Sequence, residues 1–357
     1  MDAPRNLQTR VLSVDRAQPD AGVIARAAEV LRGGGLVAFP TETVYGLGAN
    51  AFNDAAVRRI FAAKERAAND PLIVHLATGG DLGRVARHVP PIAATLAARF
   101  WPGGLTLVLP KQPTVPGSAT AGLDTVAVRV PAHPVAHALI AAAGVPVAAP
   151  SANRFTRTSA TTAAHVLADL GGRIELVLDG GPADVGLEST VVAVREDGLT
   201  VLRPGAVPVE ALEAALREQH PGAAVQLARR GDPVVAPGML DKHYAPRARL
   251  VYVRGPREAA VALLAARLRQ AADGGRVGVL LFDADRPALD IPAEAVTFAL
   301  GDEAALDEVA HRLSAGLRAL DEAGAEVIFA RQPAGGGLAA AIDDRLRRAA
   351  TEIAGVE

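Results

Sequence analysis

The chain has 357 residues, of which 37 are basic and 39 acidic, giving a formal net charge of −2. Apolar residues make up 50% and aromatic residues 3%, which excludes a disordered chain and argues against a surface built on base stacking. Residues 1–220 hold 20 basic and 20 acidic side chains, so positive charge must be focused locally if it binds an anion. Cysteine is absent, which excludes disulfides, thiolate zinc sites and thiol nucleophiles.

No export or membrane signal is evident in the sequence. The first 20 residues lack the apolar stretch of a signal peptide, and the longest apolar stretch, residues 138–150, is too short to span a bilayer. We therefore expect a cytoplasmic protein without membrane contact.

In residues 1–220, short β-branched or apolar runs alternate with Ala- and Leu-rich runs, which is typical of an α/β fold. The expected helices span residues 20–32, 54–66, 91–100, 133–143, 160–170 and 208–218. The expected strands span residues 35–39, 72–76, 104–110, 125–130, 146–149, 174–178, 189–194 and 199–203. Because several of these strands are separated by turns only, we expect a twisted mixed sheet with flanking helices.

The pattern changes after residue 220. Residues 221–248 are rich in glycine and proline and have little periodicity, which predicts a linker. Strands and helices then alternate regularly over residues 249–357, which predicts a small doubly wound domain with a parallel sheet. The expected strands span 249–254, 276–282, 295–299 and 325–329, and the expected helices 256–272, 303–322 and 337–350.

Polar residues follow the first predicted strand, in Pro40-Thr41-Glu42-Thr43-Val44-Tyr45-Gly46-Leu47-Gly48. Hydroxyls, a carboxylate and two glycines at the carboxyl end of a strand suit a ligand site. An ordinary strand-to-turn joint has the same composition, so this motif alone leaves both readings open.

A basic pair, Lys64 and Arg66, lies at the end of the helix predicted before Pro71. Only three of the 37 basic residues are lysine, which favours a need for a compact ammonium at Lys64. A point charge beside a planar guanidinium suits a triphosphate. The alternative is a solvated helix end, where basic residues complement the helix dipole. His75, in the following strand, is expected to be a hydrogen-bonded core histidine.

Further candidates occur at later strand ends. Arg129 lies in an apolar strand, on the same face as Thr125, and needs a bound anion or a structural partner such as Asp124. Ser151 and Asn153 end another strand and Ser159 heads the next predicted helix, where hydroxyls bind phosphate or simply cap the helix.

A glycine-rich approach, Gly180–Gly186, leads to Ser189, and Arg203 ends a neighbouring strand. No phosphate loop of the G-x-x-x-x-G-K-[ST] type occurs. His133 and His137 are spaced like metal ligands on a helix but lack a third ligand, so we expect a structural role and no protein metal site. Asp283 and Asp285 are expected to begin a turn.

Together these motifs resemble the YrdC-like domain of L-threonylcarbamoyladenylate synthases. The resemblance rests on Pro40–Gly48, Lys64-x-Arg66 with Pro71-Leu72, Trp101-Pro102-Gly103, Thr125–Arg129, Pro150–Asn153, Gly181–Val191 and Arg203-Pro204-Gly205, in that order. Pro237-Gly238-Met239 and His243-Tyr244-Ala245-Pro246 resemble the linker of the two-domain form, whose extension is Rossmann-like. Ala67 departs from the usual proline after the K-x-R motif.

The resemblance implies ATP-dependent synthesis of L-threonylcarbamoyl-AMP from L-threonine and bicarbonate or CO2, with release of pyrophosphate. It also implies Mg²⁺ on the phosphates and transfer of the product to a tRNA-modifying transferase complex. Lys64 and Arg66 are then the catalytic residues. The implied threonine site comprises Thr41, His75, Arg129, Ala149 and Ser189. The implied ATP site comprises Lys64, Ala68, Thr125, Ser151, Ser159, Arg203 and Tyr244, with Tyr244 as a lid and the serines and Thr125 as neutral donors.

Three alternatives differ in class from this enzyme, one of them a catalytically idle scaffold, against which the presence of every charged motif position argues. An RNA-binding YrdC-type module without adenylation activity is the main alternative, but the neutral charge of residues 1–220 favours a small anionic ligand and no tight nucleic-acid binding. A carbamoyl transferase of hydrogenase maturation contains a similar domain, but the absence of cysteine argues against it.

Overall fold

The computed structural model describes residues 7–229, 232, 235–239, 243–271 and 275–355. The chain divides into two compact units, which we call unit 1 and unit 2. Unit 1 comprises Met1–Phe155, Ser159–Asp184 and Glu188–Leu240. Unit 2 comprises Asp241–Glu357 together with the short segments Thr156–Thr158 and Val185–Leu187.

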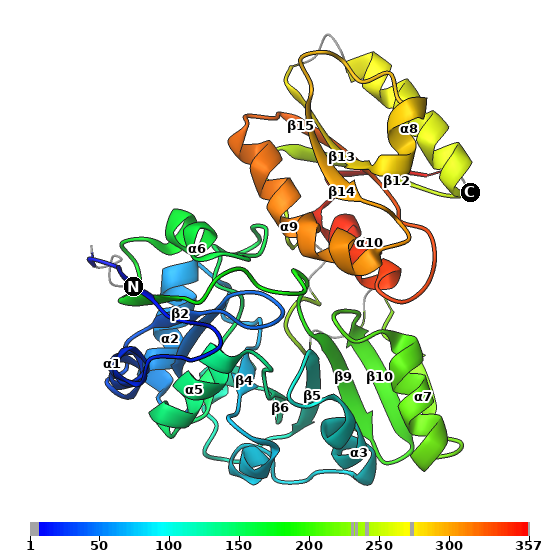
Figure 1. Cartoon of the computed structure of the whole chain (residues 1–357). Coiled ribbons are helices and arrows are strands. Elements are labelled where there is room, and N and C mark those ends of the chain that lie inside the picture. The colour runs from blue at the N-terminus through cyan, green and yellow to red at the C-terminus, as the bar shows by residue number, and fades with distance from the viewer. Residues whose placement is uncertain (1–6, 230–231, 233–234, 240–242, 272–274, 356–357) are drawn as a thin grey trace. The chain divides into compact units, whose positions relative to one another are not determined.

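Unit 1 is built on one mixed sheet with the strand order β1-β8-β2-β3-β7-β4-β6-β5-β9-β10-β11 (Figure 1). Its strands are β1 (Arg10–Ser13), β2 (Val37–Phe39), β3 (Gly46–Asn50), β4 (Ile73–His75), β5 (Leu105–Pro110), β6 (Thr125–Arg129), β7 (Val147–Ala148), β8 (Leu176–Asp179), β9 (Thr190–Arg195), β10 (Gly198–Arg203) and β11 (Ala224–Leu227). Parallel and antiparallel neighbours both occur, as the short connections predicted.

Helices cover both faces of this sheet. They are α1 (Ala21–Arg32), α2 (Asp54–Lys64), α3 (Pro91–Phe100), α4 (Gly117–Thr120), α5 (Pro134–Ala143), α6 (Ala163–Leu170) and α7 (Val209–Gln219), with a 3-10 helix at Gly79–Arg84. Capping fixes several ends: the Asp20 side chain accepts from the Val23 amide, and Gly144 ends α5 in the left-handed conformation.

The strands alternate their side chains between two apolar layers. Val37 and Phe39 of β2 pack with the α1 and α5 residues of one layer, whereas Ala38 packs into the other. Figure 1 shows α1 and α5 side by side on that face. This two-sided burial holds the strand ends, and therefore the loops that follow them, in fixed positions.

Unit 2 is a doubly wound domain with an entirely parallel sheet, in the order β14-β13-β15-β12-β16, as predicted. Its strands are β12 (Arg249–Arg254), β13 (Val277–Phe282), β14 (Val296–Gly301), β15 (Val327–Arg331) and β16 (Glu352–Gly355). Its helices are α8 (Arg257–Ala271), α9 (Leu306–Glu322) and α10 (Ala339–Ala349), with a 3-10 helix at Asp283–Ala288. Leu280 packs with the α9 and α10 layer and Leu281 with the α8 layer.

Several elements differ from the prediction. The strands β1, β3, β11 and β16 were not expected; β3 was missed because its glycines have low strand propensity, and β11 lies within the segment expected to be a linker. Helix α6 starts at Ala163 with Thr162 as its N-cap, so the prediction that Ser159 heads this helix is wrong. His133 is the N-cap of α5 rather than a helical residue.

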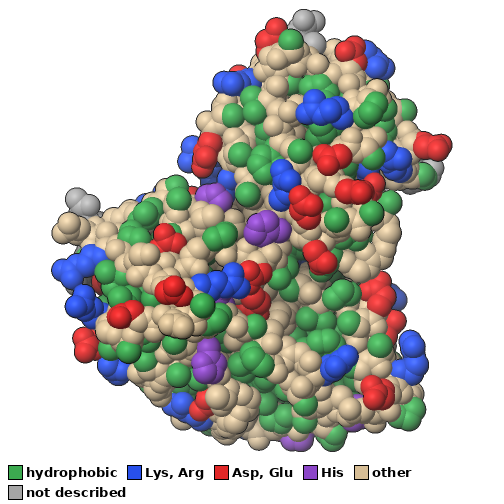
Figure 2. Space-filling view, viewed as in Figure 1, with side chains coloured by type: hydrophobic (Ala, Val, Ile, Leu, Met, Phe, Trp, Pro, Cys, Tyr) green, Lys and Arg blue, Asp and Glu red, His purple; other side chains and the backbone are tan. Residues whose placement is uncertain are grey.

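No helix formed by the described residues has both the length and the apolar character needed to cross a membrane. On the face in Figure 2, basic and acidic side chains are interspersed.

A buried arginine joins three strand ends of unit 2. Arg331 Nε lies 2.5 Å from Asp285 Oδ2, and Arg331 Nη1 lies 2.7 Å from Glu303 Oε1. The guanidinium also lies 4.3 Å from the Phe282 ring centroid. Asp285, in the 3-10 helix that follows β13, therefore pairs its carboxylate with the Arg331 guanidinium.

Arg331→Met should lower the stability of unit 2 by about 3–5 kcal/mol, because the buried Asp285 and the partly buried Glu303 lose their buried counterion and keep only the exposed Arg257. The matched control is Arg257→Met: Arg257 pairs with the same Asp285, but its side chain is 46% exposed, so we expect a loss below about 1 kcal/mol. Scanning calorimetry of the full chain measures both. Equal shifts in the two variants would contradict this account.

Candidate functional site

The loop after β2 is folded by its own hydroxyls. Thr41 Oγ1 donates to the Val44 carbonyl at 2.6 Å and lies 2.8 Å from Thr43 Oγ1. Tyr45 and Gly46 then return the chain into β3, and the Tyr45 hydroxyl donates to the Gly181 carbonyl at 2.6 Å. Thr41 is thus buried in a defined turn that presents Glu42 and Thr43 to Arg129.

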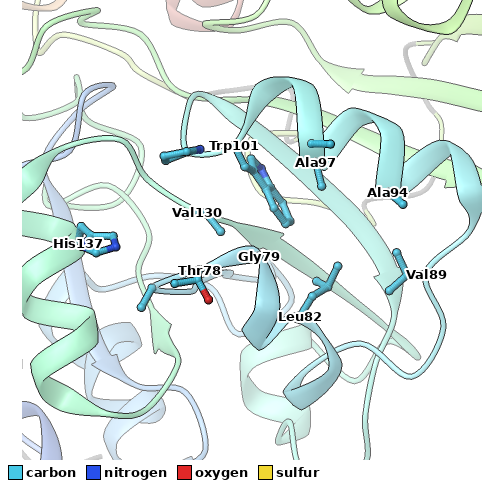
Figure 3. A pocket seen from close by; sticks show the side chains of 12 residues that line it. Thr78, Gly79, Leu82, Val89, Ala94, Ala97, Trp101, Val130 and His137 are labelled. Atoms are coloured by element: carbon cyan, nitrogen blue, oxygen red, sulfur yellow. The ribbon is translucent and has the colours of Figure 1, made fainter. Parts of the chain in front are cut away.

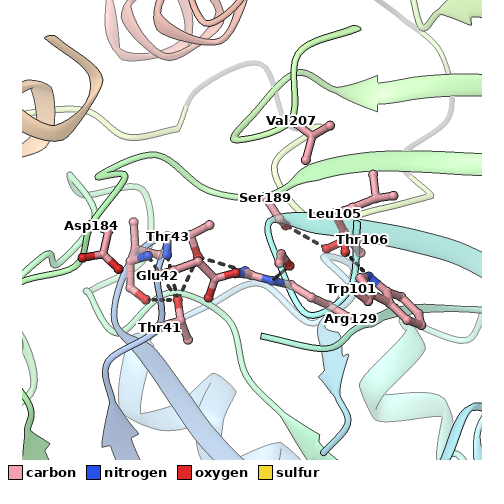
Figure 4. A network of polar contacts seen from close by, with 12 residues as sticks. Thr41, Glu42, Thr43, Trp101, Leu105, Thr106, Arg129, Asp184, Ser189 and Val207 are labelled. Carbon is pink, nitrogen blue, oxygen red and sulfur yellow. Dashed lines mark hydrogen bonds and ion pairs between the residues drawn. The ribbon is translucent and has the colours of Figure 1, made fainter. Parts of the chain in front are cut away.

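Arg129, at the end of β6, is the centre of a polar network (Figure 4). Its Nε donates to the Gly103 carbonyl at 3.0 Å, its Nη1 to Thr43 Oγ1 at 2.9 Å and its Nη2 to Glu42 Oε1 at 2.5 Å. Glu42, not Asp124, is therefore the acid that Arg129 needs. These partners engage three of the five guanidinium N–H groups.

His75, at the end of β4, pairs in register with Arg129 on the neighbouring strand. Its imidazole is fully buried, and Nδ1 lies 3.3 Å from the Ile73 carbonyl. Burial, and secondarily the positive charge of Arg129, lower the pKa of His75 to about 3. His75 is therefore neutral at physiological pH, as expected for a core histidine, yet it lies beside the central arginine.

Ser189 and Arg203 contact each other directly. Ser189 Oγ lies 2.7 Å from Thr106 Oγ1, and Arg203 Nη2 donates to the Ser189 carbonyl at 2.8 Å and to Ser189 Oγ at 3.2 Å. Residues 105–106, 189–190 and 203 lie at the same edge of the sheet as His75 and Arg129, because β5 and β9 begin where β4, β6 and β10 end.

Side-chain alternation puts the strand residues of this group on one sheet face. His75 and Arg129 lie two residues after Ile73 and Ala127, and Thr106 lies two residues before Val108. Those three apolar residues share one buried cluster, so the polar residues extend the same face.

Lys64 is the last residue of α2, where Glu65 ends the helix in the left-handed conformation. Lys64 is 1% exposed, and its ammonium donates to the Ser151 carbonyl at 2.5 Å and to the Asn153 carbonyl. Lys64 is therefore not a solvated helix end. It joins α2 to the loop that carries Ser151 and Asn153.

Arg66 pairs with Asp70, a fully buried carboxylate, with Arg66 Nη2 2.8 Å from Asp70 Oδ2. Burial raises the pKa of Asp70, while the positive charges of Arg66, Lys64 and Arg203 act in the opposite direction. Arg66 is thus paired with a buried carboxylate of its own segment.

Ser159 lies on the loop before α6 and is buried. Its hydroxyl donates to Glu188 Oε1, and Glu188 immediately precedes Ser189.

The remaining predicted residues are less closely connected. Ala149 is buried at the end of β7, and its amide donates to the Ile73 carbonyl at 2.8 Å. For Ala68 and Thr125, no hydrogen bond to another candidate residue is found within the described ranges. Tyr244 belongs to unit 2, where its ring lies 4.0 Å from the His243 ring and 4.7 Å from the Arg345 guanidinium carbon.

The described residues contain no group of three or more His, Asp or Glu side chains that could hold a metal ion. His133 illustrates this: its Nδ1 accepts from the Val135 amide, and it has a capping role.

An apolar cavity of about 550 Å³ lies elsewhere in unit 1 (Figure 3). Trp101, Val130 and His137 are among the residues that line it. None of the residues expected to bind threonine or ATP lines this cavity. Val130 follows Arg129 in sequence, but Arg129 is not among the residues that line this cavity.

Four residues of this network were not assigned a role from the sequence: Glu42, Asp70, Thr106 and Glu188. Glu42 and Glu188 lie inside the quoted motifs, and Asp70 adjoins Pro71, so position in a motif was a usable signal. Thr106 had none, because a threonine inside an apolar strand is ordinary.

The two units define a class: a mixed α/β domain with buried cations and hydroxyls on one sheet face, in a chain that also contains a parallel α/β domain. Residues 29–205 match the Sua5/yciO/yrdC family model, described as "Telomere recombination". Residues 207–351 match the model "Threonylcarbamoyl-AMP synthase, C-terminal domain". The chain belongs to the threonylcarbamoyl-AMP synthase family in its two-domain form.

Individual relatives agree with this family. Threonylcarbamoyl-AMP synthase of Pyrococcus abyssi is 45% identical over 329 residues, covering 90% of this chain and 92% of that protein. The Bacillus subtilis protein of that name is 44% identical, covering 92% of each. A crystal structure of P. abyssi Sua5 complexed with L-threonine superposes with a TM-score of 0.89 at 41% identity, covering 98% of this chain and 100% of that chain. The predicted family, fold and enzyme class are confirmed.

The neutral state of His75 predicts a pH effect on stability. Between pH 6.5 and about 3 the unfolded chain binds a proton at this position and the folded chain does not, so stability falls as the pH falls through this range. His75→Asn should therefore flatten the pH dependence by up to about 1.4 kcal/mol per pH unit. Urea unfolding followed by Trp101, the one tryptophan, measures this. An unchanged slope would contradict the assignment.

Proposed function

We propose that this chain synthesises L-threonylcarbamoyl-AMP from L-threonine, bicarbonate or CO2, and ATP, with release of pyrophosphate. One observation supports this most strongly: buried cations and hydroxyls of unit 1 contact partners from other motifs, where Arg203 donates to the Ser189 carbonyl, Lys64 to the Ser151 carbonyl and Arg129 to Thr43 Oγ1. The P. abyssi relative is named for this activity, and the match covers 92% of its length.

The proposed reaction requires a site that orders the substrates and neutralises their charge, and it requires no covalent intermediate with the enzyme. The threonine amine attacks the carbon of CO2, forming a C–N bond and, after loss of a proton, a carbamate. A carbamate oxygen then attacks the α-phosphorus of ATP, and the bond from that phosphorus to pyrophosphate breaks. Positioning and charge neutralisation supply most of the acceleration in such phosphorus chemistry.

In this proposal, Arg129 binds the threonine carboxylate through the N–H groups that Thr43, Glu42 and Gly103 leave over. Thr41, His75 and Ser189 fix the other polar groups of the amino acid, and the Ala149 backbone completes this part of the site. Because Glu42 already neutralises Arg129, the pair presents the two signs of charge that a zwitterionic amino acid also carries.

Lys64 and Arg66 are the proposed catalytic residues, because with Arg203 they stabilise the triphosphate and the leaving pyrophosphate. Ala68, Thr125, Ser151 and Ser159 complete the nucleotide site, and Tyr244 closes over the nucleotide as a lid. Mg²⁺ bound to the phosphates would supply further charge neutralisation. We propose that the reaction takes place in the cytoplasm and that the product passes to a tRNA-modifying transferase complex.

Lys64→Met should lower kcat/KM for pyrophosphate release by at least about 100-fold, since a buried ammonium at the phosphates is lost. Lys111→Met is the matched control: Lys111 lies 3.4 Å from the Val115 carbonyl and from Thr120 Oγ1, away from the network. It should retain activity near that of the unmodified chain. Activity of Lys64→Met at the control level would remove Lys64 from the mechanism.

The proposed reaction is tested by the incorporation of radiolabelled bicarbonate with L-threonine and ATP, omitting each in turn. Labelled product should form only when all are present. An RNA-binding module without adenylation activity would give no labelled product, and its RNA binding would weaken steeply with salt. The absence of product at every substrate concentration would overturn the proposal.

A further inference from the structure

Two loops that carry proposed substrate residues are joined by one carboxylate. Ser159, proposed for the nucleotide, donates its hydroxyl proton to Glu188, which immediately precedes Ser189, proposed for threonine. Ser159 is 1% and Glu188 7% exposed. A buried hydrogen bond to a charged acceptor is stronger than one between neutral groups.

The backbone beneath this carboxylate is held in place. The Ala206 amide donates to the Glu188 carbonyl at 3.0 Å, and Arg203 donates to the next carbonyl, that of Ser189. A Cβ at Gly205 would lie 2.3 Å from the Glu188 carbonyl oxygen, so only glycine permits this approach. The backbone at Glu188 therefore cannot shift without moving Ser189, and the Glu188 side chain contacts Ser159 from this fixed position.

The direction of the hydrogen bond fixes the orientation of the Ser159 side chain. Its hydroxyl keeps its proton and donates it to Glu188 Oε1, so the position of Glu188 sets where the Ser159 oxygen lies.

We propose that Glu188 is a positioning residue that couples nucleotide binding to threonine binding. The inference rests on the proposed function. A nucleotide that orders Ser159 also orders Ser189 through Glu188, and threonine that orders Ser189 does the reverse. The coupling is reciprocal, because each ligand must change the affinity of the other by the same factor.

The test is calorimetric titration of the full chain with L-threonine, with and without a non-hydrolysable ATP analogue and Mg²⁺. The ratio of the two Kd values for L-threonine is the coupling factor. We expect about 5–150-fold tighter threonine binding in the presence of the nucleotide for the unmodified chain. Glu188→Ala should reduce this factor to within about twofold of unity, whereas Glu188→Gln, which keeps an acceptor oxygen, should retain part of it.

Glu175→Ala is the matched control. Glu175 is a carboxylate of unit 1 that is half-buried, whereas Glu188 is buried; it pairs with Arg59 and accepts from the Leu36 amide at 2.9 Å. It has no contact with Ser159 or Ser189 among the hydrogen bonds of the described residues, so the coupling factor should stay unchanged. A general cost of removing a buried carboxylate would lower the factor in both variants and would overturn the proposal.

A double-mutant cycle gives a second readout that does not depend on one variant. Ser159→Ala should lose the coupling to the same extent as Glu188→Ala, and the double variant should lose no more, because both remove the same bond. Circular dichroism verifies folding; should Glu188→Ala unfold, Glu188→Gln and Ser159→Ala decide the question.

The outcomes separate the two proposals. If the unmodified chain binds neither ligand, the proposed function fails. If it binds both but has a coupling factor of one, or if Glu188→Ala and Ser159→Ala keep the factor of the unmodified chain, the function stands and the role of Glu188 is overturned.

Discussion

Buried positive charge is the constraint on which the candidate site depends. A guanidinium or ammonium group removed from water is costly unless oxygen atoms surround it. Arg129 meets this need with Glu42 and backbone carbonyls, and Lys64 meets it with the carbonyls of Ser151 and Asn153. The loops that provide these oxygens are thereby held by the charges that we propose to bind substrate.

The mixed sheet makes this arrangement possible. Strands β4, β6 and β10 end, and β5 and β9 begin, at the same edge, so loops from distant parts of the sequence meet there. A purely parallel sheet would place only strand ends at that edge. Unit 2, with its parallel sheet, uses its strand ends differently: Arg331, Asp285 and Glu303 neutralise one another within the fold.

The sequence by itself determined the α/β class, most helices and strands, the parallel sheet of unit 2 and the family. These follow from local periodicity and from motifs whose order along the chain is specific. It also singled out several residues that the structure buries in polar contacts: Arg129 as a cation in an apolar strand, Lys64 as a rare lysine, and Ser189 after a glycine-rich approach. Each of these is a local anomaly, visible without knowledge of any partner.

Only the tertiary structure decided which of these residues meet. Arg129 pairs with Glu42, 87 residues away, rather than with nearby Asp124. Ser159 donates to Glu188 instead of capping the next helix. Thr106 acquires its place from strand register, and Asp70 acquires its place from burial against Arg66. The physical reason is that a buried charge selects its partner by distance in space, and distances between loops are set by the whole sheet rather than by neighbouring residues.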